Sequence, residues 1–229
     1  MLFRSGGPAA ARNHGALSTD AELIAFTDDD CAPEPGWLLA LARALAGAPG
    51  AVAGGRTLNG LPGAFCPEAS QLLLEHVVDW FMEAGRPFFA SNNLALPAAL
   101  FAELGGFDPG FHLAAGEDRE FCDRAFERGV EFRPARGAVV RHCHRLGPIG
   151  FTRQHFNYGR GAWRFRLRRA RRGSGGGRIE PPRFYAALLA RPFRAGRGLA
   201  AVPLSLLLGW SQAANAAGFF HERWLGRRR

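Results

Sequence analysis

LIAFTDDD, residues 23–30, is the stretch of sequence that decides the fold. Its apolar half has the length and composition of a strand that is buried on both faces. Proline and glycine follow at 33–36, a Leu- and Ala-rich helical pattern runs over 37–46, and a second apolar run covers 51–55. A strand, a helix and a strand with short connections predict two parallel strands of an α/β sheet.

Further elements extend this α/β pattern along the chain. Apolar residues at helical spacing predict helices over 8–18, 67–83, 98–104 and 117–128. Residues 87–96 have the pattern of extended chain, and short strands are expected over 131–133 and 138–142. The predicted fold class is α/β, with a mixed, mostly parallel sheet flanked by helices and with a helical C-terminal extension.

The composition indicates a globular and basic protein. The chain has 229 residues, of which 47% are hydrophobic, enough to bury at least one sizeable core. Its 29 Lys and Arg residues exceed its 20 Asp and Glu residues, which gives a net charge of +9. Such a charge favours an anionic partner, and nucleic acid, anionic lipid and a nucleotide diphosphate all satisfy it.

The four cysteines are far apart and form no CxxC pair. This spacing argues against a structural zinc ribbon and against a disulfide framework, so we expect reduced thiols in a cytosolic protein. The first residues of the chain carry no long apolar core behind a basic region. A secretory signal is therefore not predicted there.

The composition changes beyond Gly150. Residues 160–172 are rich in arginine, and residues 173–177 have the composition of a Ser/Gly linker. We therefore predict an α/β domain over 1–150, a basic helix with its linker over 151–178, and a helical, membrane-associated segment over 179–229.

The segment 199–220 contains no charged residue and is bordered by arginines on both sides. About 20 apolar residues are enough to span a bilayer, but Ser211, Gln212 and Asn215 dilute the hydrophobicity of this segment. A spanning helix, peripheral or re-entrant docking and a buried helix all stay open as interpretations. Together with reduced thiols, membrane contact favours a cytoplasmic location at the inner face of the cell membrane.

Three adjacent aspartates, Asp28, Asp29 and Asp30, end the first predicted strand. Open α/β sheets bind ligands at the carboxyl ends of their strands, and adjacent carboxylates repel one another, so we expect a cation there. Mg²⁺ and Mn²⁺ prefer oxygen ligands and commonly take one or two carboxylates together with substrate phosphates. The alternative interpretation is a solvated acidic turn or a helix cap before Trp37.

A second carboxylate pair, Glu117 and Asp118, opens a later predicted helix after a glycine. The helix dipole alone favours acids at this position. A carboxylate opposite a metal-bound diphosphate can also act as a general base, a role worth typically ~10²–10⁴-fold in rate. His142 follows a third predicted strand and is a candidate ligand of the same metal, although a histidine at a strand end is more often structural.

Seven short motifs stand in one order along residues 9–144. They are ARNHG at 11–15, LIAFTDDDCAP at 23–33, WL at 37–38, GG at 54–55, SNNLA at 91–95, GGFD at 105–108 and GED at 116–118. Each motif alone is weak, whereas the ordered set is specific. In this order and spacing the chain resembles the family 2 glycosyltransferases of the GT-A fold.

The resemblance implies roles for the residues that match these motifs. Asp28 and Asp30 match the ends of the metal-binding DxD element, with Asp29 between them. His142, ahead of His144, is the candidate for a further ligand of this metal. The cofactor, Mg²⁺ or Mn²⁺, would neutralise the departing nucleotide diphosphate. The residues that match the nucleotide-binding segments are Arg12, Asn13, Asp28 and Asp29.

The resemblance also implies which residues form the acceptor site. Asp118 matches the catalytic base of inverting members, and Glu117 is its neighbour in the acceptor pocket. Gln154, Tyr158 and Arg160 match only loosely the polar loop with which some members close the site. The loops that shape the donor-sugar and acceptor sites match Asn92, Asn93, Gly106, Phe107 and Asp108.

The activity that the resemblance implies is hexosyl transfer from a nucleotide-sugar donor to an acceptor hydroxyl, with inversion and with a divalent metal. The acceptor would be a polysaccharide, a lipid-linked molecule or another hydroxyl compound. Family members begin with a strand, a helix and a strand that build the nucleotide pocket, whereas few residues precede Pro8 here. We therefore expect residues 1–150 to be a partial GT-A domain and the chain to be a fragment, and an inactive fragment is one interpretation.

Two other classes of protein share parts of this pattern. A glycoside hydrolase also needs paired carboxylates, but it needs neither an acidic triplet at a strand end nor a nucleotide pocket. A non-catalytic module for nucleic acid or a membrane surface would depend on the arginines of 160–172, but no nucleic-acid-binding signature accompanies them and no nucleic acid is expected as partner. A zinc site at 142–144 is disfavoured because adjacent residues of a strand point to opposite faces.

Overall fold

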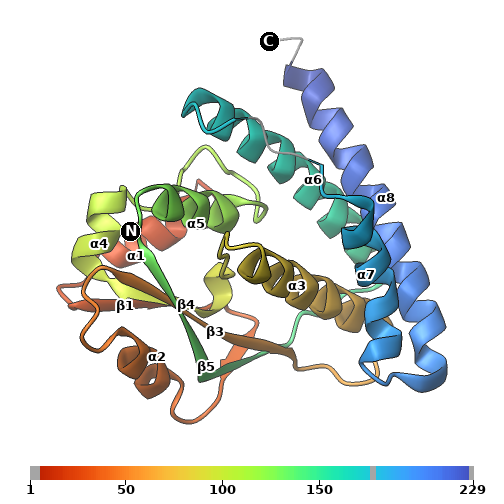
Figure 1. Ribbon diagram of the computed structural model, residues 1–229, viewed down its shortest axis with the longest axis horizontal. Helices are drawn as coiled ribbons and strands as arrows, with labels where there is room; N and C mark the ends of the chain where they lie inside the picture. Colours follow the sequence, from red (N-terminus) through yellow and green to blue (C-terminus); the bar gives the residue numbers. More distant parts are fainter. Residues whose placement is uncertain (1–5, 176–178, 227–229) are drawn as a thin grey trace. The chain divides into compact units, whose positions relative to one another are not determined.

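The computed structural model describes residues 6–175 and 179–226 (Figure 1). Residues 1–5, residues 176–178 with the end of the predicted linker, and the terminal arginines at 227–229 lie outside the described residues. The chain divides into two compact units. The first holds residues up to Gly60 together with Phe81–Cys143, and the second holds Leu61–Trp80 together with the residues from His144 onward.

The first unit is built on a five-stranded sheet with the order β1-β4-β3-β5-β2. β3 and β5 pair in parallel, whereas β1/β4, β4/β3 and β5/β2 pair antiparallel. β1, β3 and β5 therefore run in one direction, and β4 and β2 run in the other. The bounds are β1 Leu23–Phe26, β2 Cys31–Pro33, β3 Ala51–Asn59, β4 Leu94–Pro97 and β5 Glu131–His142.

The expected α/β class, with a mixed sheet flanked by helices, is confirmed, but most ladders of the sheet are not parallel. The strand, helix, strand order does give β1 and β3 the same direction, as predicted. β4 lies between them and is antiparallel to both. A run as short as 94–97 carries no sign of its direction, so this insertion is not readable from the sequence. The two strands expected at 131–133 and 138–142 form one strand because β3 pairs with both.

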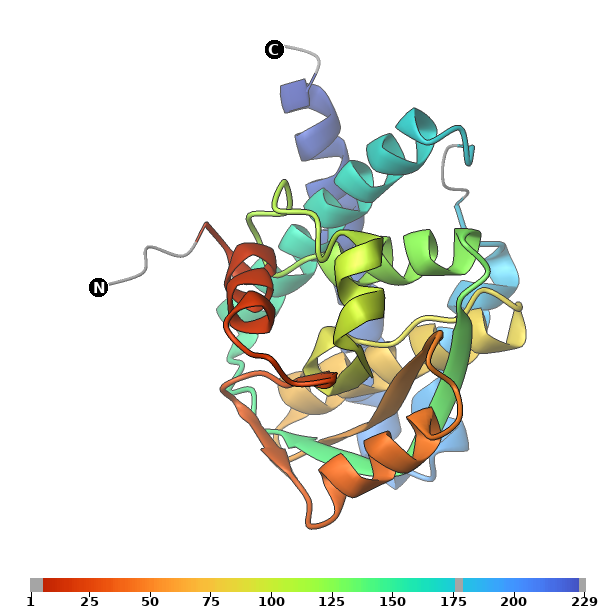
Figure 2. The same cartoon turned by 90° about the vertical axis from the view of Figure 1, so that its left-hand side faces the viewer.

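Helix α2 (Trp37–Leu45) covers one face of this sheet, as Figure 2 shows. It buries one side chain per turn, those of Trp37, Leu41 and Leu45, against small strand residues that include Ala53 and Val140. The other side of the sheet carries three helices (Figures 1 and 2). These are α1 (Pro8–Leu17), α4 (Ala98–Leu104) and α5 (Glu117–Glu127).

Four phenylalanine rings form the core under these three helices. Phe26 comes from β1, Phe101 from α4, Phe107 from the loop after α4, and Phe121 from α5. Their ring centroids lie between 4.9 and 5.7 Å apart in tilted and edge-on pairs. Each such pair adds about 0.5–1.5 kcal/mol beyond the burial of its area. The cluster therefore holds the first turn of α5 close to the end of β1.

The buried side-chain amide of Asn93 ties three elements of this unit together. Its Oδ1 accepts a hydrogen bond from Trp37 Nε1 at 2.9 Å, and its Nδ2 donates to the carbonyl oxygens of Arg56 and Ala138, each at 3.0 Å. Gly55 leaves the space for this amide, because a Cβ at that position would lie 2.4 Å from Asn93 Oδ1 and 2.2 Å from the Ala138 oxygen. Asn93 and Gly55 together fix α2 and β5 against β3.

The second unit is helical. Helices α6 and α8 approach each other so closely that their backbones touch. A Cβ at Gly159 would lie 1.8 Å from the carbonyl oxygen of Asn215, and a Cβ at Gly218 would lie 1.8 Å from that of Phe156. The helices of this unit are α3 (Phe65–Glu83) in its part up to Trp80, α6 (Pro148–Arg171), α7 (Pro182–Arg194) and α8 (Ala201–Gly226).

Helix α8 contains most of the uncharged segment that begins at Leu199. One of its faces is buried, through Leu204, Leu208, Ser211 and Gly218. Among residues 6–175 and 179–226, none of the helices has the combination of length and apolar character that crossing a membrane requires.

The contact between α6 and α8 leads to a prediction about stability. Replacement Gly218→Val should destabilise the fold by about 3 kcal/mol or more, because the helices must separate to admit the new side chain. The control is Gly209→Ala on the same helix, where a Cβ meets only Leu189 Cδ2 at 3.8 Å. Denaturant unfolding should show no loss for the control and a gain of up to about 1 kcal/mol from helix propensity. Equal denaturant midpoints for Gly218→Val and Gly209→Ala would contradict the close contact between α6 and α8 at Gly218.

Candidate active site

The first unit brings most of the predicted site residues to one region, where β1 ends, α5 begins and β5 ends. They form two groups. One is an ion-pair group centred on Arg12 of α1, with Asp28 and Glu117. The other is a cluster of Asp30, Cys31 and His142.

Arg12 bridges the carboxylates that follow β1 and that open α5. Its Nη2 donates to Asp28 Oδ1 at 2.6 Å, and its Nη1 donates to Glu117 Oε1 at 2.9 Å. Burial opposes the charge on Arg12, but the neighbouring carboxylates outweigh burial and raise its pKa above the ordinary value. Arg12 is therefore a fixed cation that holds two predicted site carboxylates together.

The Glu117 side chain is buried, and that of Asp118 is half-buried. Glu117 Oε2 has no hydrogen-bond partner among the described residues. Burial, followed by the charge of Asp118, raises the pKa of Glu117 to about 7. Burial likewise raises the pKa of Asp118, although Arg12 and the backbone N–H groups of Arg119 and Ser91 oppose the rise. Near neutral pH, this pair is therefore poised to take up or to release a proton.

The backbone holds Asp118 in one orientation. The N–H of Arg119 donates to its Oδ1 at 2.7 Å, and the N–H of Ser91 reaches its Oδ2 at 3.5 Å. Ser91 belongs to the short 3₁₀ turn η1 (Ser91–Asn93), which precedes β4. The sequence singled out Asn92 and Asn93 in this turn and missed Ser91, because a backbone donor leaves no trace in residue type.

The second group lies where β2 meets the end of β5. His142 Nε2 is 3.2 Å from Asp30 Oδ2, and Cys31 Sγ is 3.9 Å from Asp30 Oδ1. The ligating atoms of Asp30, Cys31 and His142 all lie within 4.8 Å of one another. A carboxylate, an imidazole and a thiol at this spacing are a donor set that fits a divalent cation.

This second group departs from the expected ligand set at two positions. Asp28 pairs with Arg12 and is not part of the cluster, whereas Cys31, which the sequence did not indicate as a ligand, is. Asp29 is exposed. Burial raises the pKa of the Cys31 thiol to about 12 in the absence of a metal.

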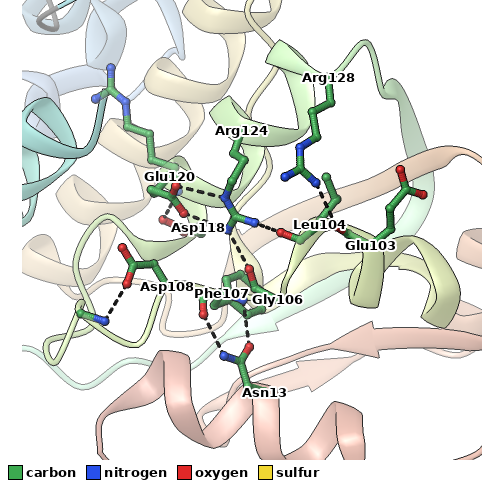
Figure 3. A network of polar contacts seen from close by, with 12 residues as sticks. Asn13, Glu103, Leu104, Gly106, Phe107, Asp108, Asp118, Glu120, Arg124 and Arg128 are labelled. Carbon is green, nitrogen blue, oxygen red and sulfur yellow. Dashed lines mark hydrogen bonds and ion pairs between the residues drawn. The ribbon is translucent and has the colours of Figure 1, made fainter. Parts of the chain in front are cut away.

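Asn13 and the loop after α4 hold each other in place (Figure 3). Asn13 Nδ2 donates to the carbonyl oxygen of Phe107 at 2.7 Å, and the N–H of Phe107 donates to Asn13 Oδ1 at 2.8 Å. Gly106 has a φ of 66°, and a Cβ there would lie 2.7 Å from Asn13 Oδ1. Arg124 Nη2 also donates to the carbonyl oxygen of Gly106, at 2.7 Å. In this structure Asn13, Gly106 and Phe107 thus serve to position the loop.

The remaining candidates also have partners within their own units. Asp108 Oδ1 accepts a hydrogen bond from the N–H of Gly110 at 2.8 Å, and Asn92 Oδ1 accepts one from Thr57 Oγ1 at 3.1 Å. The loosely matched Gln154, Tyr158 and Arg160 all lie on α6 in the second unit. There Gln154 Nε2 donates to the Tyr158 hydroxyl at 2.9 Å, and Arg160 pairs with Glu222 at 2.7 Å.

Comparisons with known proteins agree with the motifs and the fold. Residues 2–102 match the family model for glycosyl transferase family 2. The pre-mycofactocin glycosyltransferases of Mycobacterium tuberculosis strains CDC 1551 / Oshkosh and ATCC 25618 / H37Rv are each 31% identical over 148 residues, which are 62% of this chain and 31% of the relative. The chain therefore spans about a third of the length of these curated relatives.

A solved structure shows the same fold. The mannosyltransferase PcManGT from Pyrobaculum calidifontis, in complex with GDP-Man and Mn²⁺, superimposes with a TM-score of 0.61 at 17% identity. The match covers 97% of this chain and 67% of the other. The ordered motifs, the matched family model and this fold lead to one conclusion: residues 2–102 match glycosyl transferase family 2, and the chain has the GT-A fold.

Proposed function

We propose that the chain provides the catalytic region of an enzyme that transfers a hexosyl group from a nucleotide-diphosphate donor to an acceptor hydroxyl with inversion. One observation carries the proposal. The Glu117 and Asp118 pair has raised pKa values, and Arg12 joins it to Asp28 after β1 through ion pairs with Glu117 and Asp28. A proton acceptor is thereby held beside a site suited to a cation and a diphosphate.

The residues present fit a divalent metal, as the donor atoms of Asp30 and His142 lie 3.2 Å apart. Such a metal would neutralise the diphosphate as it departs. The Mn²⁺ named with the similar mannosyltransferase supports Mn²⁺ or Mg²⁺ as the cofactor. Asp28, being paired with Arg12, would join the metal only if that ion pair opened.

Asp118 would remove the proton from the acceptor hydroxyl as the hydroxyl attacks the anomeric carbon, on the face opposite the diphosphate. The backbone donors at Ser91 and Arg119 keep its carboxylate in one orientation, which a general base requires. Glu117, whose Oε2 has no hydrogen-bond partner among the described residues, would accept a hydrogen bond from the bound acceptor. Inversion follows from a single displacement.

The competing interpretations receive less support. A glycoside hydrolase would not need a cluster of metal ligands next to its carboxylates. The arginine-rich helix α6 is a weaker nucleic-acid surface than its sequence suggests, because Arg160 and Arg164 both pair with Glu222.

Membrane contact belongs to the same proposal. Val202, Leu206 and Trp210 are 56%, 71% and 55% exposed and follow one side of α8, and Leu199, in the short 3₁₀ turn η2 (Gly198–Ala200) before this helix, is 97% exposed. Leu189 of α7 joins Leu206 and Trp210 in lining an apolar groove between the two helices. We propose that this face lies in the interface of an anionic membrane, at its cytoplasmic side, and that the acceptor is a lipid-linked molecule or a polysaccharide.

The first prediction concerns catalysis. With Mn²⁺, the purified chain should release nucleotide from one of a panel of UDP- and GDP-sugars, and EDTA should abolish the release. Asp118→Asn and Asp30→Ala should each lower the rate by about 10²-fold or more. Asp20→Asn, at an exposed position between α1 and β1, should not change it. A version extended upstream with the first section of a relative is assayed in parallel. Metal-independent release by both versions would contradict the proposal.

The second prediction concerns pH. Asp118 must lose its proton before it can act as a base, and burial raises the pKa values of both carboxyls of the pair, so the rate should rise with pH across the range in which the pair titrates. In Glu117→Gln one negative charge beside Asp118 is lost, so the pKa of Asp118 falls and the rising limb moves down by about one pH unit or more. The pH dependence of kcat/KM for donor hydrolysis measures this. If kcat/KM rose at the same pH in the unchanged chain and in Glu117→Gln, a group other than this carboxyl pair would control the rate.

The third prediction concerns the membrane. The chain should co-sediment with vesicles that contain phosphatidylglycerol, and less with phosphatidylcholine alone. The double replacement Val202→Ser and Leu206→Ser should weaken binding at least about tenfold through lost apolar burial. Leu38→Ser, at a 62% exposed position on α2, is the matched control and should bind like the unchanged chain. Unchanged binding of the double variant would exclude this face as the contact.

A further inference from the structure

We infer that the thiol of Cys31 is a third protein ligand of the metal centre and that it shifts the preference of the centre towards thiophilic cations such as Zn²⁺ and Co²⁺. The inference rests on the proposed function only in that it concerns the same centre. It adds a ligand that neither the DxD pattern nor the comparisons indicate.

The sheet register places Cys31 beside His142. The two residues are direct partners in the antiparallel ladder of β2 and β5. Directly opposite residues of such a ladder present their side chains on the same face, with Cβ atoms about 4.5–5.5 Å apart. The thiol and the imidazole therefore share one side of the sheet because of strand pairing, not because of a chance rotamer.

The backbone also holds Asp30 at this edge. The N–H of Cys143 donates to the carbonyl oxygen of Asp30 at 2.7 Å, and the N–H of Cys31 donates to that of Asp28 at 3.1 Å. These bonds close the turn that joins the aspartates to β2. The carboxylate of Asp30 thus stays next to the pair formed by Cys31 and His142.

The separations suit a tetrahedral ion. Metal bonds of about 2.0–2.3 Å at tetrahedral angles put neighbouring ligand atoms about 3.3–3.7 Å apart. His142 Nε2 is 3.2 Å from Asp30 Oδ2, Cys31 Sγ is 3.9 Å from the other oxygen, Oδ1, and one ligating atom of each residue lies within 4.8 Å of the other two. Three protein donors at this spacing leave one position for an oxygen atom of the substrate, which is the arrangement of a catalytic site.

The chemistry of the donors sets the preference. Oxygen donors suit Mg²⁺ and Mn²⁺, whereas thiolate and imidazole donors suit zinc and its neighbours. Any site with nitrogen and oxygen donors already binds Zn²⁺ more tightly than Mn²⁺. The inference therefore concerns the part of this preference that Cys31 adds, and the thiol proton leaves for solvent when the metal binds.

The competing account is that Cys31 only fills space. It packs beside the core that α2 forms on the sheet, with Ala25 and Ala40. A space-filling cysteine would give a Cys31→Ser variant with unchanged metal preference and no sulfur signal from a bound metal. The two accounts therefore differ in a spectrum as well as in an affinity.

The test is a titration of the purified full chain with Co²⁺, followed by absorption. A thiolate ligand should give an intense near-ultraviolet charge-transfer band, which Cys31→Ser should lack. Cys143→Ser is the matched control, since Cys143 is a half-buried cysteine next to His142 but outside the cluster, and it should keep the band. In competition with a chromophoric chelator, Cys31→Ser should lose Zn²⁺ affinity at least about tenfold and keep its Mn²⁺ affinity within about threefold.

The outcomes separate this inference from the proposed function. Co²⁺ binding without the band, or a band that persists in Cys31→Ser, overturns the inference whatever the activity. A band that depends on Cys31 in a chain without metal-dependent donor hydrolysis supports the inference and counts against the function. Cys31→Ala, checked by circular dichroism for a native fold, must repeat the result for serine, so that a folding defect is not mistaken for a lost ligand.

Discussion

The side-chain amide of Asn93 is the interaction on which the first unit depends. It is buried, and its bonds to Trp37, Arg56 and Ala138 join α2, β3 and β5 at one point. A buried polar group that loses its partner costs about 1–3 kcal/mol, and here one residue supplies three partners at once. Because β5 carries His142 at its end and pairs there with β2, the amide indirectly fixes both strands that bear the metal-binding cluster.

Local signals explain why most elements were predictable. Apolar periodicity closed by glycine gave α4 its observed bounds, Ala98–Leu104, and placed α2 within a residue at each end. The Ala-rich run from Pro8 placed α1 equally well. The order of the strands in the sheet could not be predicted in this way, because it depends on contacts between segments that are distant in the sequence. Nothing in residues 94–97 says that β4 enters between β1 and β3, and nothing in residues 134–137 says that β5 continues through them.

The candidate site likewise has a part that the sequence predicted and a part that it did not. The carboxylates were visible because acidic residue types can be read directly from the sequence and stand at the predicted end of a strand and the predicted start of a helix. The ligand set is harder to read, since Arg12, sixteen positions earlier, takes Asp28, and since only the β2/β5 register brings Cys31 to His142. Asn93 and Phe107 were assigned to substrate contact by resemblance, yet the first is saturated by the fold and the second is wholly buried.

The crossing of α6 and α8 has a consequence for how this unit can vary. At Gly159 and at Gly218 the atom in the way of a side chain is a main-chain carbonyl oxygen. Every residue type carries that oxygen, so no substitution elsewhere along the facing helix can open the space. A substitution of either glycine therefore cannot be compensated by a second substitution at the residue it meets. In this helix pair, residues can vary freely only on the surfaces that face away from the crossing.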